Sequence, residues 1–208
     1  MIKQKVKLIE YKEDTLYRTD RFESIINNKE YRKYIEDAIN YGIFRYEKEF
    51  KEEYYGLPFL KLYEQYKMVD LALLSNYRKI HSSFRGSGLL SNGKEYFLFI
   101  DLHKEEGIDE RINYKDKFLS ENYFQWQSPN ATKQDLDRGK NIIFNKDRNV
   151  NLHLFVRKYK EIDKKAQPYI YIGKGDTVEY EGEKPITVKL KLQSEVPTKI
   201  YREFVEKV

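Results

Sequence analysis

Hydrophobic residues recur at helical spacing in the first third of the chain. Tyr66, Val69 and Leu73, for example, follow one another at steps of three and four. Such steps place apolar side chains on one face of a helix. Gly42 and a later glycine–proline segment interrupt the pattern. The sequence therefore predicts two or three helices within residues 20–74.

The pattern changes to strand-like alternation after residue 77. Aromatic and β-branched residues alternate or run together in several short segments, as they do in half-buried and buried strands. These segments are residues 95–103, 151–157, 169–172, 178–181 and 186–192. A Ser-Asn-Gly sequence at 91–93 predicts a hairpin turn, and residues 135–144 predict one short helix.

These elements together predict an α+β fold. We expect a mostly antiparallel, barrel-like sheet with a helical N-terminal portion packed on it or beside it. The expected division is a helical portion at residues 1–76 and a sheet domain at residues 77–208.

Composition restricts the possible chemistry. The chain has 39 Lys and Arg against 34 Asp and Glu, a net charge of +5, which permits a polyanionic partner without requiring one. Cysteine is absent, which excludes disulfides, cysteine-ligated zinc and thiol catalysis. We expect no membrane span, no signal peptide and a cytoplasmic location, because the apolar runs are short.

Motifs for catalysis are missing from the sequence. The three histidines, His81, His103 and His153, show no metal-ligand spacing. Gly86-Ser87-Gly88 lacks the Lys-Ser/Thr pair of a phosphate-binding loop, and the carboxylates follow no nuclease order. We therefore expect a chain with no catalytic residues, no metal and no cofactor.

One segment, residues 122–132, has the composition of a base-binding pocket. It holds the only tryptophan beside other aromatics and small polar residues, which could stack on a base and contact its edge. The candidates are Phe124, Trp126, Gln127, Ser128, Asn130 and Thr132. The alternative is that Phe124 and Trp126 point into the core of an alternating strand.

Two further regions could contact nucleic acid. The polar, glycine-rich loop at 82–88 could approach phosphate or enter a groove, and basic strand ends could bind phosphate. The candidates are Ser82, Ser83, Arg85 and Ser87 in the loop, and Arg157, Lys158 and Lys174 elsewhere. The alternatives are an ordinary flexible loop and solvated hairpin ends.

Four runs in this order resemble one family. They are HSSFRGSGLLSNGKEYFLFIDLHKEE, YKDKFLSENYFQWQSPNAT, VNLHLFVRKYKE and PYIYIGKGDTVEYEGEKPITVKLKL. The chain resembles, over roughly residues 60–205, the C-terminal domain of type IV, modification-dependent restriction enzymes of the SauUSI type. In those bacterial proteins a phospholipase D-type nuclease and a DEAD/DEAH helicase precede the domain.

The resemblance implies a PUA-like β-barrel similar to the SET- and RING-associated (SRA) domain. Such domains flip a modified base into an aromatic pocket, and the target implied here is 5-methylcytosine or 5-hydroxymethylcytosine in double-stranded DNA. The implied partners are the helicase and nuclease modules of a parent restriction enzyme in the bacterial cytoplasm. Related pockets use an aspartate for the cytosine amine, and Asp101 and Asp116 are the nearest candidates.

Three other functions stay open on the sequence. The chain could read an unmodified DNA sequence, it could be a docking platform for the helicase and nuclease, or it could read RNA. Binding to methylated and unmethylated duplexes of one sequence distinguishes the first two of these functions from a modified-base reader.

Overall fold

The computed structural model describes residues 7–49, 60–74, 88–103 and 116–206. The chain divides into two compact units, residues 1–52 and residues 53–208, which are described separately. No helix within the described ranges is long and apolar enough to cross a membrane.

Over residues 7–49, the first unit holds a hairpin followed by two helices. Strands β1 (Ile9–Lys12) and β2 (Thr15–Arg18) pair antiparallel and lead into α1 (Asp20–Ile26) and α2 (Lys29–Glu49). The side chain of Thr19 caps α1 by accepting a hydrogen bond from the backbone N–H of Phe22. The predicted helices are confirmed here, whereas the hairpin was not predicted.

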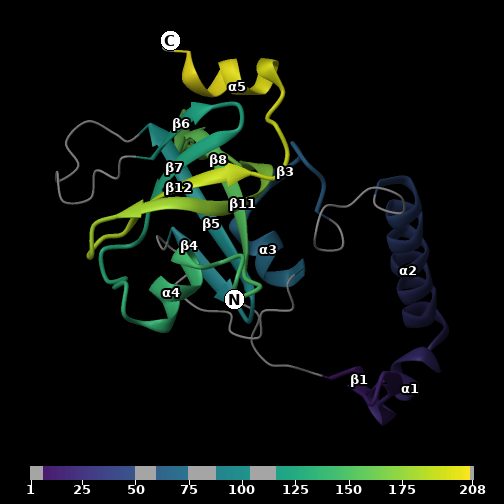
Figure 1. Cartoon of the computed structure of the whole chain (residues 1–208). Coiled ribbons are helices and arrows are strands. Elements are labelled where there is room, and N and C mark those ends of the chain that lie inside the picture. Colours follow the sequence, from purple (N-terminus) through teal and green to yellow (C-terminus); the bar gives the residue numbers. More distant parts are fainter. Residues whose placement is uncertain (1–6, 50–59, 75–87, 104–115, 207–208) are drawn as a thin grey trace. The chain divides into compact units, whose positions relative to one another are not determined.

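The second unit is built on one large sheet (Figure 1). Its strands run in the spatial order β4-β5-β8-β11-β12-β7-β6, and β3 pairs with β11 beside this path. The strands are β3 (Gln65–Tyr66), β4 (Leu89–Asn92), β5 (Glu95–His103), β6 (Lys117–Ser120), β7 (Tyr123–Gln127), β8 (Asn151–Tyr159), β11 (Tyr169–Glu181) and β12 (Thr187–Leu192).

The α+β prediction is confirmed, and the sheet is mostly antiparallel. The parallel pair is β5–β8, in which Phe99 lies opposite Phe155. Within the described residues the path ends at β4 and β6, so the sheet is unclosed. The hairpin predicted at 91–93 joins β4 to β5, with Gly93 at a φ of 62°.

One boundary prediction was wrong. We expected separate strands at residues 169–172 and 178–181, but β11 runs without interruption through both. The pairing register of β11 with its neighbouring strands shifts at Tyr171/Gly173 and at Thr177/Glu179. These shifts have the character of β-bulges, which bend a strand without ending it.

Within the described residues, three helices and a small hairpin complete the second unit. They are α3 (Met68–Leu74), α4 (Asp137–Ile143), α5 (Thr198–Val205) and the pair β9 (Glu161–Ile162) and β10 (Lys165–Ala166). The predicted helix at 135–144 is confirmed by α4. The segment 60–74 belongs to the sheet unit of the structure, and the domain boundary expected at residue 76 stays a prediction.

Alternation along the central strands gives the sheet two different faces. In β5 and β8 the even-numbered residues, such as Leu98 and Leu154, join the large apolar core, which α5 also covers through Phe204. The odd-numbered residues, such as Phe99 and Phe155, form a second, aromatic cluster with β11 and the segment 60–71. Successive side chains of a strand point to opposite faces, so both clusters follow from one pattern.

Candidate functional site

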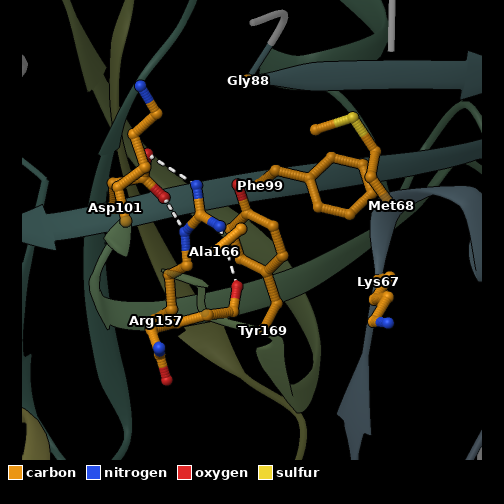
Figure 2. Close-up of a pocket in the computed structure, with 10 residues that line it drawn as sticks. Lys67, Met68, Gly88, Phe99, Asp101, Arg157, Ala166 and Tyr169 are labelled. Carbon is orange, nitrogen blue, oxygen red and sulfur yellow. Dashed lines mark hydrogen bonds and ion pairs between the residues drawn. The ribbon is translucent and has the colours of Figure 1, made fainter. Parts of the chain in front are cut away.

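The aromatic face of the sheet ends in an open pocket of about 490 Å³ (Figure 2). This volume lies in the range of small-ligand sites in proteins. Strands β5, β8 and β11, the β9–β10 hairpin and the start of α3 supply its walls. The lining residues are Lys67, Met68, Gly88, Phe99, Asp101, Arg157, Lys160, Ala166, Gln167 and Tyr169.

An ion pair lies in the wall of the pocket. Asp101 on β5 and Arg157 on β8 are register partners across the parallel pair. The Nε of Arg157 lies 2.6 Å from Oδ1 of Asp101, and Nη2 lies 3.2 Å from Oδ2. The third guanidinium nitrogen, Nη1, donates to the carbonyl oxygen of Gln167 at 2.8 Å. This bidentate geometry fixes the planes of both groups.

Tyr169 carries the aromatic part of the same wall. The guanidinium carbon of Arg157 lies 4.2 Å from the centre of its ring, which is a cation–π contact. Phe99 meets the same ring edge-on at 5.1 Å. Burial, followed by the charge of Asp101, raises the pKa of the Tyr169 hydroxyl above its usual value. The tyrosine therefore stays neutral and can donate a hydrogen bond at physiological pH.

The pocket combines three chemical features. Phe99, Met68 and Tyr169 give apolar surface, Asp101 gives a carboxylate acceptor, and Lys67 and Lys160 bring positive charge. A planar ligand with an amine on its edge matches the first two features, and an attached phosphate chain matches the third. Among the described residues, no group of three histidines or carboxylates is placed to hold a metal ion.

A second polar group, centred on His153, lies buried within the aromatic face, where its ring stacks on Phe97. Nδ1 of His153 lies 2.8 Å from the hydroxyl of Tyr171, and Nε2 lies 2.6 Å from Oε2 of Glu95. Burial lowers the pKa of His153, and the Glu95 contact opposes it without reversing it. Burial tends to raise the pKa of Glu95, but hydrogen bonds from His153 and Asn151 bring it below its usual value. This network ties β5, β8 and β11 together.

The predicted segment 122–132 lies apart from the pocket. Phe124 and Trp126 are 0% and 2% exposed and belong to the large core. The side chains of Ser128 and Thr132 are also buried, and Ser128 Oγ accepts from the backbone N–H of Ile186 at 3.0 Å. Phe124 and Trp126 thus point into the core, as in the alternative interpretation of this segment as an alternating strand. A role for them in base binding stays a prediction.

The other members of that segment lie at its surface or bind neighbouring strands. Gln127 donates through Nε2 to the hydroxyl of Thr187 at 3.1 Å, and Asn130 is exposed. The backbone N–H of Gln127 also donates to Oδ1 of Asp116 at 2.8 Å. Of the two candidate amine acceptors, only Asp101 therefore lines the pocket.

The predicted phosphate contacts divide in the same way. The guanidinium of Arg157 is directed into the pocket wall, while Lys158 donates to the backbone oxygen of Glu206 at 2.7 Å. Lys174 donates to Oδ1 of Asn151 at 3.5 Å. The loop candidates Ser82, Ser83, Arg85 and Ser87 lie outside the described residues.

Sequence reasoning named Asp101 as a pocket candidate and Arg157 as a phosphate contact, but it did not name the residues that lie beside them in the pocket wall. Phe99 and Tyr169 lie in segments that the sequence identified only as strands, and Lys67 and Met68 lie in a region predicted as helix. The sequence did carry one signal for these neighbours: the odd-numbered residues of 95–103 and of 151–157 lie on one face of each strand. This signal locates the pocket only if the two strands are known to be neighbours, which the sequence does not show.

A family profile described as "Domain of unknown function (DUF3427)" matches residues 60–204. The chain belongs to the DUF3427 family. The match includes every residue that lines the pocket and excludes the first compact unit. No curated protein matches the chain significantly.

Solved structures of SRA domains resemble the DUF3427 chain at low identity. The SUVH5 SRA domain in complex with hemimethylated CG DNA matches with a TM-score of 0.42 and 17% identity, covering 70% of this chain and 97% of the other. The same domain bound to fully hydroxymethylated CG DNA matches with 0.42 and 15%, covering 70% and 99%. SUVH6 of Arabidopsis thaliana in complex with SAM matches with 0.41 and 14%, covering 74% and 31%.

Proposed function

We propose that this chain is a DNA-reading module that binds double-stranded DNA containing 5-methylcytosine or 5-hydroxymethylcytosine. The flipped base would enter the pocket formed by Phe99, Asp101 and Tyr169. The observation that carries the proposal is the carboxylate of Asp101 in a pocket with aromatic walls. This pocket is built from segments of sequence that resemble those of modification-dependent restriction enzymes. The chain itself performs no catalysis in this proposal.

The pocket chemistry suits cytosine in particular. Asp101 can accept a hydrogen bond from the exocyclic amine, which thymine lacks, and the aromatic side chains can stack on the ring. Stacking contributes about 1–3 kcal/mol per base, which offsets the few kcal/mol that unpairing costs. Phosphate binding by lysines such as Lys67 and Lys160 would add an affinity that is independent of sequence and sensitive to salt.

The methyl group itself adds a small affinity. Burying one methyl contributes about 0.8 kcal/mol, close to a fourfold preference. Met68 lies in the wall and is suited to sensing such a group, because its thioether side chain adapts to the shape of its neighbours. A strong biological preference would therefore need a tight fit or a later checkpoint.

The later checkpoint would belong to a larger protein. In this proposal the domain follows a helicase and a phospholipase D-type nuclease in a longer protein, and these modules would translocate and cleave DNA after the reading module has bound. The module would thereby direct a type IV restriction enzyme to modified foreign DNA in the bacterial cytoplasm.

Direct binding measurements test the proposal. The chain is titrated into three labelled duplexes of one sequence that carry cytosine, 5-methylcytosine or 5-hydroxymethylcytosine at one position. A modified-base reader binds at least one modified duplex more tightly at every salt concentration. Equal binding to all three contradicts the modified-base proposal and favours an unmodified-sequence reader, and the absence of binding favours protein docking.

A further inference from the structure

Arg157 is bound more extensively than a phosphate-binding arginine needs to be. Its side chain is 12% exposed, and all three guanidinium nitrogens donate to Asp101 or to Gln167 within the second unit. Its charge also lies over the ring of Tyr169. An arginine free to reach DNA phosphate is usually exposed and solvated.

The fork of Arg157 controls how Asp101 can act. A carboxylate has two oxygens and about four acceptor directions. Arg157 occupies one direction on each oxygen, and Figure 2 shows both contacts on the side of the carboxylate that faces the guanidinium. The hydroxyl of Tyr169 also takes part in a hydrogen bond with Asp101. The acceptor directions that then remain can serve a ligand, and the carboxylate plane cannot rotate without breaking both bonds to Arg157.

We infer that Arg157 is a positioning residue that sets the base selectivity of the pocket. The inference rests on the proposed function. By fixing the plane of Asp101, Arg157 aims the free acceptor directions at an exocyclic amine and keeps the carboxylate from turning away when a carbonyl enters. The pocket then accepts amino-pyrimidines and rejects keto-pyrimidines such as thymine, which shares the methyl group of 5-methylcytosine.

Geometry rather than charge performs this function, which distinguishes arginine from lysine. Lysine is a point charge with rotating donors, whereas the guanidinium is a planar fork that matches a carboxylate. Arg157→Lys therefore keeps the charge in the wall but releases the plane of Asp101. A purely electrostatic role would survive this substitution, and a positioning role would not.

The test compares three bases at one position of one duplex. 5-Methylcytosine, cytosine and thymine are each placed opposite an abasic site, so that differences in base pairing do not contribute. We expect the wild-type chain to prefer 5-methylcytosine over thymine. Arg157→Gln and Arg157→Lys should each lower this preference about tenfold, the size of one hydrogen bond to a charged group. The dependence of binding on salt should not change.

A matched control separates positioning from general stability. Lys189 makes the same kinds of contact outside the pocket, with Nζ 2.8 Å from Oε1 of Glu179 and 5.3 Å from the ring centre of Tyr123. Lys189→Gln should leave the 5-methylcytosine preference unchanged. If Arg157→Gln lowers the affinity for all three bases equally, together with the melting temperature, Arg157 is structural only and the inference is wrong.

A charge exchange gives the sharpest result. The double variant Asp101→Arg with Arg157→Asp preserves an ion pair but presents donors to the base, so thymine should now bind better than 5-methylcytosine. A folded double variant that still prefers 5-methylcytosine overturns the inference. A wild-type chain without preference between 5-methylcytosine and thymine also overturns the inference, whereas equal binding to 5-methylcytosine and cytosine contradicts the proposed function, so the two failures are distinguishable.

Discussion

Strand β7 and the strand trio β5–β8–β11 both carry aromatic side chains next to polar ones, but they place them in different surroundings. On β7, Phe124 and Trp126 turn into the large core, where Phe118 meets Phe124 edge-on at 4.8 Å. On the trio, Phe99 and Tyr169 belong to the smaller cluster and line an open pocket. Aromatic side chains thus form a candidate binding site where, among the described residues, they line an open pocket and are not fully covered by other side chains.

Polar partners mark the same difference. Trp126 lies among apolar residues of the large core, whereas the smaller cluster borders the Asp101–Arg157 ion pair, because Arg157 lies over the ring of its member Tyr169. Charged groups are costly to bury unless they are paired and hydrogen-bonded. A paired carboxylate that still borders a cavity is therefore more informative about binding than an aromatic-rich segment.

The largest expected effect concerns stability in the β7 region. Trp126→Ala removes a fully packed side chain and should lower the free energy of unfolding by about 3–5 kcal/mol, measured by chemical denaturation. Gln125→Ala, on the opposite face of the same strand, is the control and should change it by about 0.5 kcal/mol or less. A Trp126→Ala chain that keeps its stability but loses its preference for modified DNA would show that Trp126 forms the base pocket.

The next effect concerns binding in the trio. Asp101→Asn removes the charged acceptor and should weaken binding to 5-methylcytosine DNA by about 1–3 kcal/mol, measured by titration with a labelled duplex. Asp116→Asn is the matched control, because Asp116 accepts from the backbone N–H of Gln127 and does not line the pocket. Equal losses in the two variants would remove Asp101 from the proposed site.

These two predictions also show where reading the sequence succeeds. The alternation in residues 95–103 and 151–157 predicted both strands, β5 and β8. The position of the pocket could not be predicted, because Asp101 and Arg157 meet only through the parallel pairing of β5 with β8. Parallel partners lie far apart in sequence, and no local turn signals their register.

Trp126, the only tryptophan in the sequence, illustrates a related physical limit on reading a sequence. A strand alternates its side chains between two faces, so a segment rich in aromatics supplies core residues at every second position. The sequence of residues 123–127 does not state which face is covered. In the structure α5 helps to cover it, with Phe204 stacked on Phe118 at 5.4 Å.

A smaller effect should appear in the pH dependence of stability. Burial keeps the pKa of His153 below its ordinary value of 6.5, and Glu95 also has a lowered pKa. The unfolded chain then binds more protons than the folded chain, so stability should fall as the pH drops below 6.5. The slope contributed by one proton is at most about 1.4 kcal/mol per pH unit. Thermal melting of the wild type and of His153→Gln is measured from about pH 7.5 to about pH 5, a range that includes the ordinary pKa of histidine. The melting temperature of the variant should depend less on pH. A profile as steep as that of the wild type would assign the acid sensitivity to other groups.

The smallest expected effect concerns the rim of the pocket. Lys160 brings a positive charge to the cavity beside Asp101 and Arg157, and a rim charge of this kind would bind phosphate without reading the base. Lys160→Ala should weaken binding to modified and unmodified duplexes alike and lower the slope of log affinity against log salt by about 0.9. Lys140→Ala, on α4, is the control of equal charge that does not line the pocket. The pocket and the phosphate contacts are separate parts of the proposed site. A change in base preference without a change in salt slope would therefore show that Lys160 contacts the base and not the phosphate.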